Sequence, residues 1–447
     1  MDQSGSVSAV GKYRRRYFVA VMLLLMVTLG YADRVNMSVA GPPIGEELGL
    51  SSGTLGLLFS AFFWSYTALL VPVGWLTDRY GTRVMIPLAV VIWSVGAIAT
   101  GLVNRFSTML GARLLLGAGE APVYPSGSMV IREWAPLKER GLFTSMLNAG
   151  ALIGPAIGSV AAAYLVTQLG WRSSFYILGG VGFVIAIVWA LTIKRPEQVG
   201  WLRSQEREYI LENRSVISAP SETSAAGGVS MSLPSLLRQS PMWGLLITQG
   251  CAVYTLYLFL TWLPTYMVEA RNEELLSAGW ITGIIYTAAA VFGIVISRVS
   301  DWYVSRERAS GGERRRAVIL LMVLSAALVI VPFVQNLGVV LTLFAWTLTM
   351  ANTAVTLNIA LTNDLIVDEA SGGLAFGLLI LGGNSFGLLA PIVTGFLVEF
   401  TGSFTIPFLL AVVLLAIGAF LTWTLVTRPL QPKEREELGS PGRPESP

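Results

Sequence analysis

Four ionisable side chains, Asp33, Arg34, Arg113 and Glu120, lie inside stretches that are otherwise apolar enough to span a membrane. An ionised group at that depth costs roughly 2.5 to 3.5 kcal/mol on insertion scales, so such groups are usually kept for a function. Two carboxylates and two guanidiniums, in a chain with no histidine, indicate a site that binds an organic anion and exchanges a proton.

Each residue type has a reason to serve in such a site. Arginine suits carboxylate binding because its planar fork donates two parallel hydrogen bonds and stays charged. A carboxylate suits proton coupling because burial raises the energy of its ionised form, while a nearby arginine opposes that effect. Since no imidazole can relay the proton, Asp33 and Glu120 are the candidate proton carriers.

The spacing of the four residues sets which of them can share a face. Arg113 and Glu120 are seven residues apart, which stacks them on one helix face, roughly 10.5 Å apart along the axis. Asp33 and Arg34 are adjacent and point in different directions, so one of them faces a cavity while the other pairs with a neighbouring helix; the sequence leaves both assignments open. The alternative is that the four charges form internal salt bridges that only neutralise one another.

The composition predicts the elements that must position these residues. The chain of 447 residues is 54% hydrophobic and 13% charged, whereas soluble domains carry about 25% charged residues. A span needs roughly 20 apolar residues. The sequence offers twelve such runs, at 17–38, 53–76, 84–103, 107–130, 141–167, 174–193, 241–267, 277–298, 315–334, 337–361, 374–399 and 404–427. The first run follows a polar, basic segment and is full length, so we expect it to remain in the mature protein.

The basic residues predict the orientation of the spans. All but five of the 30 Lys and Arg residues lie in segments that share one side if both termini are cytoplasmic. The exceptions are Arg34 and Arg113 within the spans and Arg105, Arg172 and Arg271 on the other side. This asymmetry predicts that both termini are cytoplasmic, and it accounts for the basic character of the chain without nucleic acid.

Two pairs of similar segments, one member in each half of the chain, predict an internal repeat. NAGALIGP at 148–155 and NSFGLLAP at 384–391 share Asn, six residues and then Pro, and GWLTDRYGTR at 74–83 is echoed by SRVSDWYVSRER at 297–308. Two parallel six-helix halves are an architecture of secondary transporters. The expected organisation is an N-terminal six-helix bundle at 1–194, a cytoplasmic linker at 195–240 with a short surface helix near 202–213, a C-terminal six-helix bundle at 241–428, and a disordered tail at 429–447.

GWLTDRYGTR fits the pattern G-x-x-x-D-R-x-G-x-R, which resembles the signature cytoplasmic loop of the major facilitator superfamily. In this loop Gly81 permits the bend and Asp78 can cap a helix or pair with an arginine. The resemblance implies a gating role for the loop residues Asp78, Arg79, Gly81 and Arg83, and for Asp301 in the equivalent loop of the second half. Together with the spans and the half repeat, it predicts an all-α membrane protein of twelve transmembrane helices in two pseudo-symmetric bundles.

Longer stretches are similar to the anion:cation symporter family within that superfamily. They are YADRVNMS, FSAFFWSYTALLVPVGWLTDRYG, RLLLGAGEAPVYPSG, WLPTY and GNSFGLLAPIVTG. That family includes bacterial permeases for galactonate, glucarate, hexuronate, tartrate and phthalate. The resemblance implies proton-coupling roles for Asp33 and Glu120, and substrate-binding roles for Arg34, Arg113, Tyr31, Tyr66, Gln249 and Asn384. For the tyrosines and amides, hydrogen bonding between helices is the alternative.

The leading hypothesis is a proton-coupled symporter that imports a small organic anion, a sugar acid or another carboxylate, by alternating access. An exchanger or exporter is the runner-up, because GALIGPAIG also resembles a motif of superfamily antiporters, and a receptor that transports nothing is a further alternative. We expect no enzymatic activity, no metal and no cofactor besides the coupling proton, because the spans hold no metal-ligand cluster and no nucleophile beside a base. The expected setting is a monomer in the lipid bilayer of a bacterial inner membrane, and Cys251 is expected to be a buried apolar residue.

Overall fold

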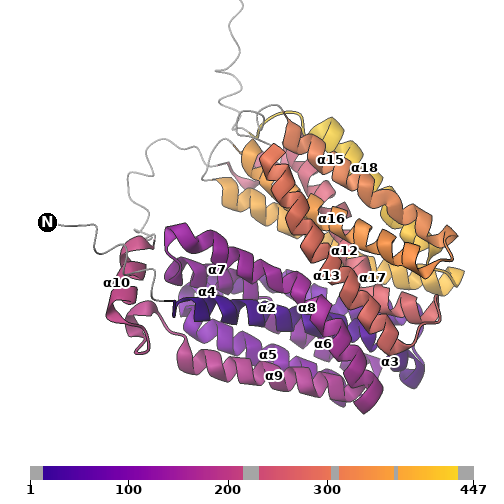
Figure 1. The fold of residues 1–447 in the computed structure, drawn as a ribbon, viewed down its shortest axis with the longest axis horizontal. Helices are drawn as coiled ribbons and strands as arrows, with labels where there is room; N and C mark the ends of the chain where they lie inside the picture. Colours follow the sequence, from indigo (N-terminus) through magenta and orange to yellow (C-terminus); the bar gives the residue numbers. More distant parts are fainter. Residues whose placement is uncertain (1–13, 215–230, 304–311, 367–370, 431–447) are drawn as a thin grey trace, which may run out of the picture. The chain divides into compact units, whose positions relative to one another are not determined.

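The computed structural model describes residues 14–214, 231–303, 312–366 and 371–430, and this part of the chain is helical except for turns, connecting segments and one isolated bridge between Ile366 and Leu430 (Figure 1). Within it lie α2 (Tyr17–Val39), α3 (Gly41–Leu48), α4 (Ser52–Tyr80), α5 (Thr82–Leu102), α6 (Phe106–Glu120), α7 (Val123–Trp134), η1 (Leu137–Glu139), α8 (Arg140–Leu169), α9 (Trp171–Thr192), η2 (Pro196–Gln198), α10 (Ser204–Asn213), α11 (Leu233–Leu237), α12 (Ser240–Glu269), α13 (Leu275–Tyr303), α15 (Glu313–Ser325), η4 (Ala326–Phe333), α16 (Leu337–Leu365), α17 (Gly372–Thr401) and α18 (Thr405–Leu425). The predicted all-α class is confirmed.

Eleven helical segments in the described residues are long and apolar enough to cross a membrane. The expected span at 107–130 is not among them as one helix, because it is divided into α6 and α7 at Ala121 and Pro122. Proline lacks the N–H that a continuing helix needs, and Pro125 follows three residues later. The chain therefore has an interrupted helix whose break comes directly after Glu120.

The helices form two compact units, which we describe separately. Unit 1 comprises Met1–Val216, Leu258–Thr287 and Pro391–Phe404, and unit 2 comprises Ile217–Tyr257, Ala288–Ala390 and Thr405–Pro447. Helices α12, α13 and α17 contribute residues to both units. The sequence predicts a different division, at 1–194, 195–240 and 241–428. That division is based on the two halves of the chain, whereas the two units are defined by contacts between residues, so it stays a prediction.

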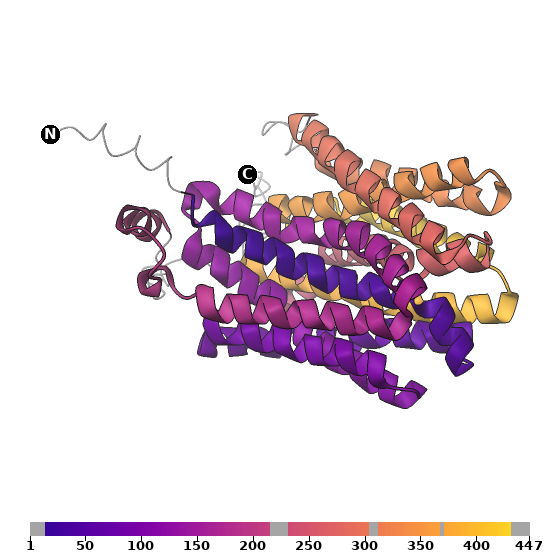
Figure 2. The same cartoon turned by 60° about the horizontal axis from the view of Figure 1, so that its bottom comes forward.

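The core of unit 1 is built around α2, which packs most extensively against α8 (Figure 2). Three glycines at four-residue spacing, Gly150, Gly154 and Gly158, make this close approach possible. A Cβ on Gly150 would lie 2.7 Å from the Val27 side chain, and one on Gly158 would lie 2.7 Å from Ala32. These glycines therefore serve helix packing, and the close contact holds α2 firmly in the unit.

The predicted surface helix of the linker is confirmed as α10, and buried charges anchor it to unit 1. Arg16 Nη1 lies 3.0 Å from Glu206 Oε1 of α10, and Arg16 Nη2 lies 2.6 Å from Glu139 Oε1. The side chain of Glu206 is fully buried. Since leaving one buried charge unpaired is costly, this triad fixes the start of α2.

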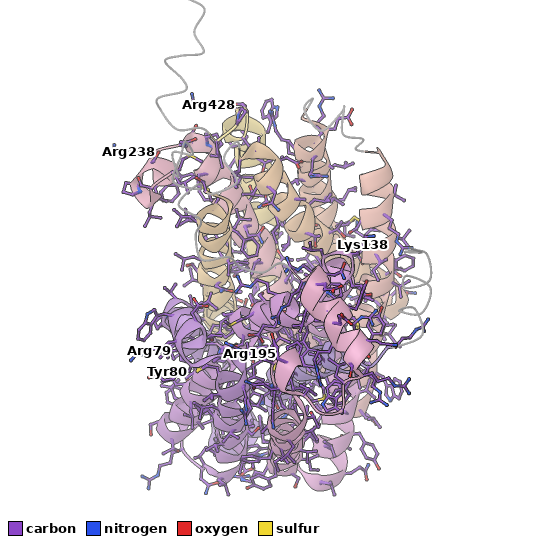
Figure 3. The ribbon with its side chains drawn as sticks, turned by 90° about the vertical axis from the view of Figure 1, so that its left-hand side faces the viewer. Arg79, Tyr80, Lys138, Arg195, Arg238 and Arg428 are labelled. Atoms are coloured by element: carbon purple, nitrogen blue, oxygen red, sulfur yellow. The ribbon has the colours of Figure 1, made fainter. Side chains whose placement is uncertain are left out.

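The loop that joins α4 to α5 turns at Gly81, whose φ of 77° is readily adopted by glycine. Asp78, Arg79 and Arg83 are exposed around this turn, and the Arg79 guanidinium lies 5.4 Å from the ring centroid of Trp75. Figure 3 labels Arg79 at the end of unit 1 that also carries Lys138 and Arg195. The gating role of these loop residues stays a prediction.

In unit 2, α15 packs against α16 and α18. The apolar core of this unit includes Cys251, a buried free cysteine, as expected. Three predicted features fall wholly or partly outside the described residues: the side chain of Asp301, the linker at 215–230, and the tail from residue 431 onward.

Candidate functional site

The Asp33-Arg34 pair lies in unit 1, in the C-terminal half of the largely buried helix α2. Asp33 is 1% exposed and Arg34 is 7% exposed. Arg34 reaches across to the end of α6, where its Nη2 and Nε donate to Glu120 Oε2 at 2.7 and 3.0 Å. Arg34 is therefore the member of the pair that binds a neighbouring helix, and it also lines the hollow described below, which Asp33 does not line.

The Arg34-Glu120 ion pair fits because Gly30 leaves room for it. Gly30 lies one helical turn before Arg34, and a Cβ there would be 3.3 Å from Glu120 Oε2. Aromatic rings hold the guanidinium from other sides: Arg34 Cζ lies 4.3 Å from the ring centroid of Tyr31, 4.5 Å from that of Phe62 and 5.2 Å from that of Tyr66. These cation-π contacts add to the ion pair and fix the orientation of Arg34.

Asp33 and Arg113 are buried without equivalent partners. Neither carboxylate oxygen of Asp33 has a hydrogen-bond partner, and Nε and Nη1 of Arg113 have none. Arg113 is 2% exposed. Asp33 nevertheless lies within electrostatic range of Glu120, Arg113 and Arg34, so the four residues form one interacting group. Buried polar groups without partners are costly, so a molecule that supplied hydrogen-bond partners here would be bound favourably.

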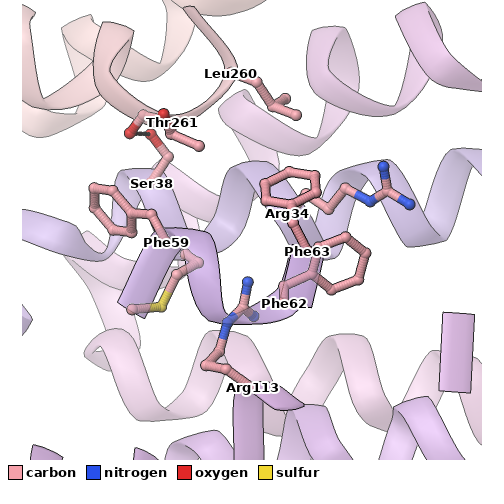
Figure 4. Close-up of a pocket in the computed structure, with 9 residues that line it drawn as sticks. Arg34, Ser38, Phe59, Phe62, Phe63, Arg113, Leu260 and Thr261 are labelled. Carbon is pink, nitrogen blue, oxygen red and sulfur yellow. Dashed lines mark hydrogen bonds between the residues drawn. The ribbon is translucent and has the colours of Figure 1, made fainter. Parts of the chain in front are cut away.

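A small hollow opens beside these residues in unit 1. Figure 4 shows the Arg113 guanidinium pointing into it, whereas the Arg34 guanidinium extends to the side. The hollow is lined by Arg34, Met37, Ser38, Phe59, Phe62, Phe63, Arg113, Leu260 and Thr261.

The charges of this group explain what it can do chemically. When all four residues are ionised, the two carboxylates and two guanidiniums cancel. A proton on Asp33 would leave one positive charge uncompensated, at an arginine with free donors that faces the hollow. The arrangement can therefore couple the binding of one negative charge to the uptake of one proton.

A second polar cluster lies in unit 2, on α12, α16 and α17. Asn358 Nδ2 donates to Gln249 Oε1 at 2.9 Å and to the Leu245 carbonyl at 3.0 Å. The Gln249 side chain packs beside Gly383, the neighbour of Asn384. Asn384 Nδ2 and Asn358 Oδ1 are buried without hydrogen-bond partners. These amides are suited to hydroxyl groups, which both donate and accept hydrogen bonds.

The structure thus brings Asp33, Arg34, Arg113 and Glu120 together in unit 1, with Tyr31 and Tyr66 against Arg34. Gln249 and Asn384 belong to unit 2. The sequence reasoning missed Gly30, Phe62 and Asn358. The spacing of Gly30 to Arg34 could have indicated the first, whereas no signal in the sequence pairs Asn358 with Gln249.

No group of three or more His, Cys, Asp and Glu residues that could hold a metal ion occurs among the residues that the structure describes.

Comparisons with known proteins give a consistent result. Residues 22–372 match the Major Facilitator Superfamily. The chain is 30% identical over 399 residues to a probable galactarate/D-glucarate transporter of Escherichia coli, with 87% of this chain and 88% of the relative covered. It is 31% identical to a probable L-galactonate transporter of the same organism, with 97% and 94% covered. The fold resembles a bacterial homologue of the lysosomal transporter Spinster, with a TM-score of 0.75, 18% identity, and 93% and 99% covered.

We predict that Gly30→Ala reduces transport several-fold without unfolding the protein. The added methyl would stand 3.3 Å from Glu120 Oε2 and push the carboxylate away from Arg34. Uptake in proteoliposomes, with the thermal midpoint as a check on folding, measures the effect. Gly111→Ala on α6 is the matched control, because nothing lies within 4 Å of a Cβ at that position. Equal activity of the two variants would contradict the role given to Gly30.

Proposed function

Because the chain belongs to the Major Facilitator Superfamily, we propose that it is a proton-coupled symporter that imports a small organic anion, a sugar acid or a related carboxylate, by alternating access. Relatives named as transporters of galactarate, glucarate and galactonate support the substrate class. The residues of the site support the coupling, as follows.

The state of Arg113 is the observation that carries this proposal. Its guanidinium is buried and points into the hollow, and its Nε and Nη1 have no partner. A substrate carboxylate offers the two acceptors that this fork needs. Arg34 is less available, because Glu120 and the surrounding aromatic rings already hold it. Arg113 is therefore the main anchor in this conformation, and Arg34 contributes when the ion pair opens.

Proton coupling follows from the charge balance of the group. An ionised Asp33 compensates Arg113, and its buried oxygens have no donors to stabilise the charge. Protonation of Asp33 removes that negative charge, so an anion binds Arg113 more favourably. By linkage, a bound anion favours the proton to the same degree, and proton and substrate travel together.

Glu120 takes the second role in coupling. Its pairing with Arg34 stabilises the ionised form, and its second oxygen, Oε1, is buried without a partner. The break between α6 and α7 directly after Glu120 permits local movement at this point. Release of Arg34 exposes Glu120 to protonation, and the freed Arg34 can then bind the substrate.

Hydroxyl groups of a sugar acid would be recognised by neutral polar side chains. Tyr31 and Tyr66 flank Arg34, and Gln249 and Asn384 supply amide groups in unit 2. Asn384 is 8% exposed, and its Nδ2 has no hydrogen-bond partner. It could donate a hydrogen bond to a hydroxyl oxygen of the substrate. These four residues are proposed as secondary substrate contacts.

The protein spans a membrane several times, and we place it in a bacterial inner membrane with both termini cytoplasmic. The basic residues support this orientation, since Arg79, Lys138 and Arg195 lie at one end of unit 1 (Figure 3). The proposed function needs no cofactor besides the proton and involves no nucleic acid. We propose a monomer as the working unit, because each chain carries both carboxylates and both arginines.

Uptake into proteoliposomes under an imposed pH gradient tests the proposal. A panel of D-galactonate, D-glucarate, tartrate and phthalate covers the expected anions. Accumulation driven by an outside-acid gradient, abolished by a protonophore, is the expected result. Exchange without any response to the gradient would favour an exchanger, and efflux toward the acidic side would favour an exporter. Binding without counterflow would indicate a receptor.

We predict that Arg113→Lys lowers the apparent affinity for the anion by about tenfold or more. Lysine keeps the charge but loses the two parallel donors, and paired hydrogen bonds to a charged group are worth about 1.5 kcal/mol or more. Concentration dependence of uptake measures the loss. Arg105→Lys, at the exposed start of the same helix, is the control and should behave as wild type. Unchanged affinity in the Arg113 variant would remove this residue from the site.

We predict that Glu120→Gln abolishes accumulation driven by pH but retains counterflow. The neutral amide imitates a permanently protonated carboxyl, so substrate can still cross while proton and substrate are no longer linked. Gradient-driven uptake and exchange are measured side by side on the same vesicles. Undiminished accumulation by this variant would remove Glu120 from the coupling mechanism.

A further inference from the structure

A carboxylate near the end of α17 closes over the start of α4 within unit 1. Glu399 Oε2 accepts a hydrogen bond from the backbone N–H of Gly53 at 2.9 Å and from Ser51 Oγ at 2.9 Å. Ser51 is the N-cap of α4, and its hydroxyl also accepts from the Thr54 N–H. The first N–H groups of a helix lack partners within the helix and carry partial positive charge. Glu399 therefore satisfies one such donor with an opposite charge.

Beside this cap the two helices touch backbone to backbone. A Cβ on Gly56 would overlap the Pro391 carbonyl oxygen, and one on Gly395 would lie 2.5 Å from the Ser52 carbonyl oxygen. Side chains at these positions would hold the helices apart. We call this contact, formed by Gly53, Gly56, Pro391, Gly395 and Glu399, the α4-α17 seam.

The seam connects directly to the hollow beside Arg113. Trp262 Nε1 of α12 donates to the Pro391 carbonyl at 3.2 Å, and the Trp262 ring lies 5.1 Å from that of Phe59. Phe59 lines the hollow, as do Ser38 and Thr261, which are joined by a hydrogen bond from Ser38 Oγ to the Thr261 carbonyl. The same end of unit 1 is therefore closed by contacts of α2 with α12 and of α4 with α17.

We propose that the α4-α17 seam is a gate on the external side of the hollow, and that Glu399 is the latch that holds it closed. The external assignment rests on the orientation given above, and the role as a gate rests on the proposed transport function. Opening requires Glu399, whose side chain is already exposed, to leave the start of α4, and this exposes the buried Gly53 N–H to water. Closing requires glycine at positions 56 and 395, because only glycine permits the approach.

The latch is tested by the reactivity of a single cysteine at this end of unit 1. Thr265 is buried, packs beside Gly41 and Ser38, and lies outside the α4-α17 seam. The native Cys251 is first replaced by alanine, and Thr265→Cys is introduced into the full chain. The rate of labelling by a membrane-impermeant maleimide then reports how often this end opens.

The proposal predicts that Glu399→Ala raises the labelling rate roughly three- to tenfold, because the loss of a charged hydrogen-bonded cap increases the open population. Glu399→Gln, which keeps an acceptor but loses the charge, should give an intermediate rate. Gly56→Ala should label fast even with Glu399 intact, because the seam cannot close. Glu46→Ala is the matched control, an exposed carboxylate of α3 in unit 1, and should label at the parent rate.

Labelling of Glu399→Ala at the parent rate would overturn the latch, even if Gly56→Ala labels fast. A parent rate in both would overturn the seam as a gate. Size-exclusion profiles and thermal midpoints identify variants that have lost their fold, and Gly395→Ala, on the opposite helix of the seam, substitutes for Gly56→Ala in that case. The assay uses neither substrate nor proton gradient, so a failure of sugar-acid uptake would overturn the proposed function without affecting this result.

Discussion

The buried ion pair between Arg34 and Glu120 is the interaction on which the rest of the site depends. It uses one arginine and one carboxylate, with both hydrogen bonds made to a single oxygen. The other two ionisable residues, Asp33 and Arg113, are buried nearby, and their polar atoms have few hydrogen-bond partners. Burying an ion pair gains little by itself, because desolvation offsets the attraction. Its value here is that it leaves one arginine unengaged beside the hollow.

The surrounding helices are arranged to keep this division of roles. Gly30 gives the carboxylate room, and Tyr31 and Phe62 hold the guanidinium. The tight packing of α2 on α8 fixes the backbone that carries Asp33 and Arg34. By contrast, α6 ends at Glu120, where Pro122 prevents a continuous helix. The proposed transport cycle requires this pair to break without loss of the fold, and the interrupted helix is the element that we expect to move.

Much of this could be predicted from the sequence, because apolar length and rare buried charges are strong signals. They indicated the helical membrane class, eleven of the twelve expected spans, the α10 helix and the four ionisable residues. The partner of Arg34 could not be predicted, since adjacent residues on a helix leave two orientations open. The interruption after Glu120 falls within the run at 107–130, which apolar length alone predicts as a single span. The pairing of Gln249 with Asn358 and the cap of Glu399 on α4 depend on contacts between distant segments, which no local pattern encodes.

The central claim is that anion binding at Arg113 brings one proton to Asp33. Calorimetric titration of the purified protein with D-galactonate, in buffers of different ionisation enthalpy, counts the protons taken up on binding. The account predicts that the wild type takes up about one proton per anion more than Asp33→Asn, which should still bind. Binding by the wild type without proton uptake, or unchanged uptake in Asp33→Asn, would contradict it.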